Sequence, residues 1–122
     1  MRRAFVAAVA ALSLAAGPAY AQSAAIPKEA EANLRCAVWA GVILGNNRDN
    51  AEVAAGFGMA LGWFTALYEG MTGKPFERAI TAAYINSVMP EIEAIEVDCK
   101  VRMQNMGQRF SDWGETLQQS GQ

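Results

Sequence analysis

A long stripe of apolar residues near the C-terminus is the feature that most limits what this chain can fold into. Its members lie three or four residues apart, and they are Ile92, Ile95, Cys99, Met103, Met106, Phe110, Trp113 and Leu117. This spacing predicts a long amphipathic helix beginning near Pro90, because an α-helix returns to the same side every 3.6 residues. Such a helix buries its stripe against other elements, so the rest of the chain must supply an apolar surface.

Two further helices are predicted before this one. The first begins near Lys28 and is apolar on most sides at residues 42–44, which predicts that this turn is buried. Gly45-Asn46-Asn47 should end it, since both residue types are favoured where the chain turns left-handed. The second follows Asp49, which forms a capping box with Glu52, and ends at a turn over residues 70–75.

The segment at 75–88 has two interpretations. Pro75 can open one helix, or Thr81 can cap a second short helix and so break the segment in two. Pro90 disfavours a helical Met89 and begins the next element. Because no stretch alternates like a strand, we predict an all-α fold: a small bundle of four helices, or five if the third is broken, stapled by one disulfide.

The first 21 residues have the features of a secretory signal peptide. Arg2 and Arg3 precede an apolar run, and Ala19-Tyr20-Ala21 is a small-x-small cleavage site. The run is shorter than the roughly 20 residues that a membrane span needs, so we expect no stable membrane insertion after cleavage. We predict a periplasmic or secreted protein with a disordered lead at 22–27, one helical domain at 28–117 and a frayed tail at 118–122.

The two cysteines of the chain, Cys36 and Cys99, should form a disulfide, because an exported chain meets an oxidising compartment. No CxxC spacing points instead to a redox or metal-binding pair. Each cysteine lies about eight or nine residues into its predicted helix, roughly 12–14 Å from the helix start. The bond therefore fits a parallel or crossed pair of helices better than a full-length antiparallel pair.

Gly58 and Gly62 lie four residues apart in the second helix, flanked by Ala54 and Ala66, and make one smooth face. Each glycine lowers helix stability by roughly 0.8–1 kcal/mol relative to alanine. We therefore expect a reason for them, namely close backbone contact with a neighbouring helix. On this expectation Gly62→Leu is harmful, because overpacking a tight contact costs about 1–3 kcal/mol.

Composition excludes several classes of function. Cleavage removes two of the ten basic residues and none of the twelve acids, which leaves 101 residues and a net charge of −4. This acidity argues against nucleic-acid binding, which requires Lys and Arg to neutralise phosphates. The chain has no histidine, which excludes Ser-His-Asp and Cys-His sites, zinc helices, histidine-ligated haem and Glu-x-x-His metal sites. We assign no catalytic, cofactor-binding or metal-binding residue, and predict that the protein is not an enzyme.

The remaining candidates are methionines, acids and aromatics. Met59, Met71, Met89, Met103 and Met106 could bind exported Cu(I), but their places on the apolar stripes favour core packing. The acids between Glu91 and Asp98 are interpreted as a solvated face at a favourable helix terminus. Most aromatic residues should be core. Trp63 and Tyr68 lie off the central stripe and are candidate partner contacts. Gly58 and Gly62 are the alternative candidates if their face points to solvent and not to a neighbouring helix.

The order of landmarks resembles the small periplasmic acid-stress chaperones of the HdeA type. The resemblance spans about residues 34–113 and consists of Cys36, Gly62-Trp63, Tyr68, Gly70 and Cys99. The spacing between the cysteines is longer than that family's pattern, and only the cysteine pair carries over. The resemblance implies a disulfide-stapled helical homodimer that loosens in acid and shields unfolded clients.

We therefore expect an exported, non-enzymatic protein that binds other proteins, in the manner of a stress chaperone. At low pH the twelve carboxylates become neutral and leave eight basic side chains, so repulsion would loosen the fold while the disulfide holds its topology. The alternative is a specific inhibitor or immunity-type protein that recognises one exported enzyme. Suppression of the aggregation of several unrelated proteins, or tight capture of one partner at neutral pH, separates the two.

Overall fold

The computed structural model describes residues 26–121, all of whose regular elements are helical. The elements are α1 (Lys28–Asn46), α2 (Ala51–Thr72), α3 (Phe76–Ala79), α4 (Ala82–Val88), the 3₁₀ turn η1 (Met89–Glu91) and α5 (Ile92–Ser120). The predicted signal peptide at 1–21 and most of the lead at 22–27 lie outside the described residues. The all-α prediction is confirmed, with the third helix broken in two.

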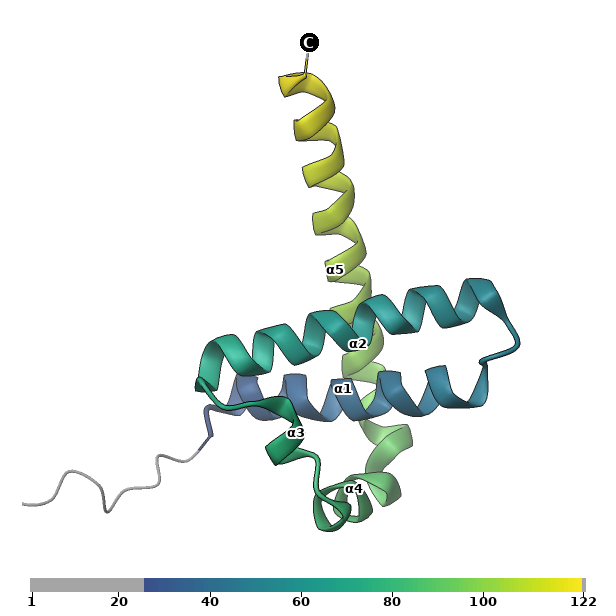
Figure 1. Cartoon of the computed structure of the whole chain (residues 1–122), viewed down its shortest axis with the longest axis vertical. Coiled ribbons are helices and arrows are strands. Elements are labelled where there is room, and N and C mark those ends of the chain that lie inside the picture. The colour runs from purple at the N-terminus through teal and green to yellow at the C-terminus, as the bar shows by residue number, and fades with distance from the viewer. Residues whose placement is uncertain (1–25, 122) are drawn as a thin grey trace, which may run out of the picture.

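α1 and α2 form an antiparallel hairpin, and α5 crosses it (Figure 1). The chain leaves the hairpin through α3 and α4, which lie on one side of it. α5 starts beside α4, passes across the hairpin and continues well beyond it on the opposite side, where the chain ends (Figure 1). It runs to Ser120, three residues past the predicted end of the domain at 117.

A disulfide joins Cys36 to Cys99 at the place where α1 and α5 cross. The two Cα atoms are 5.3 Å apart, and both side chains are buried. The predicted bond and the predicted crossed arrangement of these two helices are therefore both confirmed. The bond closes a long loop, 63 residues in sequence separation, and so fixes α5 on the hairpin.

The core lies along the hairpin in two clusters. The larger surrounds the disulfide, and its buried members are Cys36, Ala37, Trp39, Ala40, Ala60, Phe64, Cys99 and Met106. Trp39 and Phe57 meet edge to face within it, with ring centroids 5.3 Å apart. The smaller cluster consists of Ala30, Leu34 and Tyr68, with α3 and α4 packed against it. Small residues on α1, such as Ala37 and Ala40, let the two hairpin helices pack closely.

Local sequence explains the helix boundaries, although two expectations were wrong. Thr81 accepts a hydrogen bond from the Tyr84 backbone N–H and so caps α4, which explains the break in the third helix. The cap of α2 is Asn50, whose Oδ1 accepts from the Val53 N–H, and not Asp49. α1 ends at Asn46 within the predicted Gly45-Asn46-Asn47 segment, but its C-cap, Asn47, is not left-handed; the Asn47 side-chain amide donates to the Ile43 carbonyl.

Ion pairs fasten the later elements to α1. Arg35 on α1 pairs with Glu91 of η1, and Arg102 on α5 pairs with Glu29 on α1. The Arg102 Nη1–Glu29 Oε2 distance is 2.9 Å, and Arg102 also binds Asp98 within its own helix. Because these side chains are partly exposed, each pair contributes modestly to stability.

The predicted close contact at Gly58 and Gly62 was wrong. A β-carbon at either position would meet no atom within 4 Å, and Gly62 is exposed to solvent. The neighbouring helix instead approaches α2 at Gly56, where a β-carbon would lie 3.8 Å from the Met103 side chain. The expected harm from Gly62→Leu therefore has no steric cause in this fold.

Residues 42–44 are only half-buried, in contrast to the predicted burial. They lie at the end of the hairpin that neither α4 nor α5 covers (Figure 1). No helix within residues 26–121 is long and apolar enough to cross a membrane.

Candidate functional site

The apolar stripe of α5 divides into a covered part and an exposed part. Cys99 and Met106 are buried under the hairpin, and Met103 and Phe110 are half-buried. Beyond them the stripe continues at the same spacing, but Trp113 is 46% exposed and Leu117 is 72% exposed. The last part of α5 projects past the hairpin (Figure 1).

An aromatic patch marks the border between the two parts. It consists of Trp63 on α2 with Arg109, Phe110 and Trp113 on α5. The ring centroids of Trp63 and Phe110 are 5.3 Å apart and those of Trp63 and Trp113 are 6.2 Å apart. The Arg109 guanidinium carbon lies 5.4 Å from the Trp63 ring and 5.2 Å from the Trp113 ring. Aromatic rings with a stacked arginine are the side chains most enriched at the centres of protein interfaces.

The aromatic patch continues onto the outer side of α2. Met59, Gly62 and Ala66 are exposed there at helical spacing, and Trp63 follows Gly62 directly. α2 carries no charged residue between Glu52 and Glu69. The exposed side of this helix is therefore apolar and nearly flat, which is unusual for a helix face in contact with water.

Among the predicted partner contacts, Trp63 belongs to the aromatic patch, and Gly58 and Gly62 lie beside it with open space around them. Tyr68 is different, since its side chain is 1% exposed and packs in the smaller core cluster. It offers no outer surface to another protein. The structure places its ring instead against a cavity between α1 and α3.

Sequence reasoning missed the exposed end of the stripe. The stripe predicts burial of Trp113 and Leu117, because their spacing continues that of Met106 and Phe110 without a break, but both are exposed. The predicted core packing of the methionines is confirmed for Met103 and Met106 but wrong for Met59, Met71 and Met89, which are exposed. One usable signal was length: α5 has 29 residues and α1 has 19, so one hairpin cannot cover the whole of α5.

The electrostatics next to the aromatic patch are set by Arg102. Its hydrogen bond and its charge lower the pKa of the Glu29 carboxyl below its ordinary value. The same hydrogen bond to Glu29 raises the pKa of Arg102, which stays charged at any ordinary pH. The ion pair between Glu29 and Arg102 therefore weakens only in acid, when Glu29 takes up a proton.

Within residues 26–121 no group of three or more His, Cys, Asp or Glu side chains could hold a metal ion. The surface on α5 and α2 presents apolar and aromatic side chains, with Arg109 stacked on the rings of Trp63 and Trp113. Comparison with protein-family models, curated proteins and solved structures finds no match for the chain.

Proposed function

We propose that this chain is an exported, non-enzymatic protein that binds apolar segments of other proteins through the aromatic patch and the end of α5. The observation that carries the proposal is the continuation of the α5 stripe past the hairpin, with Leu117 72% exposed. Within residues 26–121 this large apolar side chain therefore lies mostly in water. Exposed apolar surface of this kind typically marks a protein-binding site.

The preferred clients are partly unfolded proteins, as in the chaperones that the sequence resembles. A flat apolar face on α2 and flexible methionines such as Met59 and Met71 suit partners of varied shape. Acid favours this role, because protonation of Glu29 removes its ion pair with Arg102, which joins α5 to α1. The buried disulfide keeps α5 attached while the rest of its contacts loosen.

The test is suppression of aggregation by the mature protein, with several unrelated client proteins, at pH 7 and at pH 3. The variants Trp113→Ser/Leu117→Ser and Leu117→Ser alone should lose most of this activity. The single variant removes a side chain that is largely in water, so its fold should be unchanged. The matched control is Val97→Ser/Val101→Ser, which removes two exposed apolar side chains from the other part of α5.

Equal suppression by the variants and the parent would refute the assignment of the surface. Failure of the parent to protect any client, together with tight capture of a single protein at neutral pH, would favour the inhibitor alternative. The resemblance also implies a homodimer, and sedimentation of the mature protein at pH 7 and pH 3 measures that directly.

A further inference from the structure

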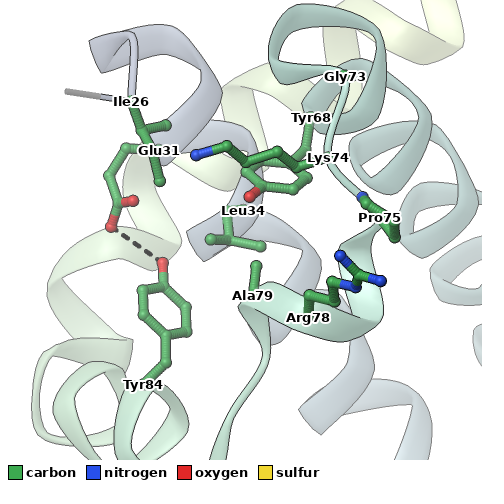
Figure 2. A pocket seen from close by; sticks show the side chains of 10 residues that line it. All are labelled: Ile26, Glu31, Leu34, Tyr68, Gly73, Lys74, Pro75, Arg78, Ala79 and Tyr84. Atoms are coloured by element: carbon green, nitrogen blue, oxygen red, sulfur yellow. Dashed lines mark hydrogen bonds between the residues drawn. The ribbon is translucent and has the colours of Figure 1, made fainter. Parts of the chain in front are cut away.

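A cavity lies away from the α5 surface, between the start of α1, the end of α2 and the short helices α3 and α4 (Figure 2). Its volume is about 570 Å³, within the range of small-molecule sites in proteins. Leu34, Ala79, Pro75 and Ile26 supply apolar walls. Cavities of this size that combine apolar walls with a few polar groups are the usual form of a ligand site.

Tyr68 gives this cavity an unpartnered polar group. Its side chain is 1% exposed, and Figure 2 shows its hydroxyl pointing into the cavity. The only hydrogen bond that Figure 2 shows among the lining residues joins Tyr84 to Glu31, with an O–O distance of 3.0 Å. Within residues 26–121 the Tyr68 hydroxyl has no partner. Because this hydroxyl is free to donate a hydrogen bond, it can bind an acceptor group of a molecule in the cavity.

The charges around the cavity favour an anion. Lys74 and Arg78 line it, and neither takes part in an ion pair within the described part of the chain. Glu31 is the one carboxylate in the lining, and it already accepts the Tyr84 hydroxyl hydrogen bond. Burial and this hydrogen bond raise the pKa of Tyr84, which therefore remains a neutral donor. The lining thus carries a net charge of +1 beside an uncommitted hydroxyl donor.

We propose that this cavity binds a small organic acid, with its carboxylate between Lys74, Arg78 and the Tyr68 hydroxyl and its apolar body against Leu34 and Ala79. The site is separate from the aromatic patch, so the proposal does not depend on the function assigned above. A fatty acid and an aryl-alkanoic acid share this chemistry, and the shape of the apolar walls decides between them.

The test is isothermal titration of the full mature protein with octanoate and with 3-phenylpropionate, using octylamine as the probe with the opposite charge. We expect one or both acids to bind with a Kd between about 10 µM and 1 mM, and the amine at least tenfold more weakly. The acid that binds more tightly shows whether the apolar walls prefer an alkyl chain or an aryl group. No binding of either acid at millimolar concentration, or equal binding of the amine, overturns the proposal.

Three variants locate the site. Tyr68→Phe removes only the hydroxyl and should weaken binding about five- to tenfold, while Lys74→Gln/Arg78→Gln should weaken it at least tenfold. Lys100→Gln is the matched control, since it removes a cation that pairs with Glu96 on α5, away from the cavity. Thermal melts confirm that each variant folds. Unchanged affinity in both cavity variants would place the acid elsewhere and overturn the assignment.

Discussion

The two halves of α5 belong to one helix and carry one apolar stripe, but they stand in different surroundings. Residues 92–106 lie against the hairpin, where Cys99 and Met106 are buried and Arg102 reaches Glu29 on α1. Residues 107–120 touch the hairpin only near their start, where Phe110 meets Trp63, and the helix then projects past it, with Leu117 largely in water. A regular apolar spacing therefore shows that a helix has a face for packing, but it does not show whether this chain provides the partner.

The difference between the halves has a thermodynamic consequence. An isolated helix of about 14 residues is only marginally stable in water. Its nucleation is unfavourable, and each residue added by propagation contributes little free energy. Gly107 and Gly114 weaken the projecting half further, at roughly 0.8–1 kcal/mol each. The N-terminal half is stabilised by packing and by a covalent bond, so the two halves should open independently.

Loss of the disulfide should have the largest effect. For a bond of sequence separation 63, the chain-entropy model gives about 4 kcal/mol of stabilisation. We expect Cys36→Ser/Cys99→Ser to lower the free energy of unfolding by about that amount in a denaturant melt monitored by circular dichroism. A loss below about 1 kcal/mol would mean that packing alone holds α5 on the hairpin.

Truncation of the stripe should distinguish its two parts. Met106→Ala removes a side chain that is 5% exposed, and we expect a loss of about 2–5 kcal/mol. Leu117→Ala removes an apolar side chain of similar size that is largely in water, and should change the free energy of unfolding by no more than about 0.5 kcal/mol. Paired denaturant melts give the comparison. Similar losses in the two variants would show that the end of α5 is packed in solution.

Glycine substitutions sharpen the contrast at smaller scale. Gly62→Ala adds a β-carbon in open space on α2, so we expect it to raise the free energy of unfolding by about 0.8–1 kcal/mol. Gly114→Ala also has open space, but it should raise the global value by less, because its half of α5 opens without the rest of the fold. A lower free energy of unfolding in Gly62→Ala would support the tight helix contact predicted from the sequence.

The smallest effect concerns the ion pair between Glu29 and Arg102. Because the pKa of Glu29 is lowered in the folded state, its contribution is present above the ordinary value near 4.5 and is lost as the pH falls through the folded value. Glu29→Gln should therefore remove part of the acid-induced fall in melting temperature. Glu115→Gln is the control, since Glu115 forms no ion pair within residues 26–121. Identical acid profiles for Glu29→Gln and the parent would exclude this contribution.

Much of the fold could be predicted because it depends on local patterns. Helical spacing located α1, α2 and α5, the proline and threonine at 75 and 81 located the broken segment, and compartment chemistry predicted the disulfide. The errors concern tertiary context. Gly62 and Met59 have the spacing of a packed face, and only the positions of the other helices show that the face is open.

The cavity illustrates the same limit. Tyr68, Lys74 and Arg78 come together because the chain turns back after α2 and places α3 beside α1. Their spacing in the sequence carries no motif that indicates a common site. Its position off the stripe of α2 predicts that Tyr68 contacts a partner at the surface. In the structure the same position places its hydroxyl in the cavity.

Amide hydrogen exchange along α5 tests the difference between its halves most directly. We predict that amides in residues 92–106 exchange nearly as slowly as those of α1, and that amides in residues 110–120 exchange at least about a hundredfold faster. The measurement should be made at low protein concentration, so that self-association does not protect the projecting half. Uniform protection along the whole of α5 would contradict the account, because it would mean that the end of the helix is already held by the rest of the fold.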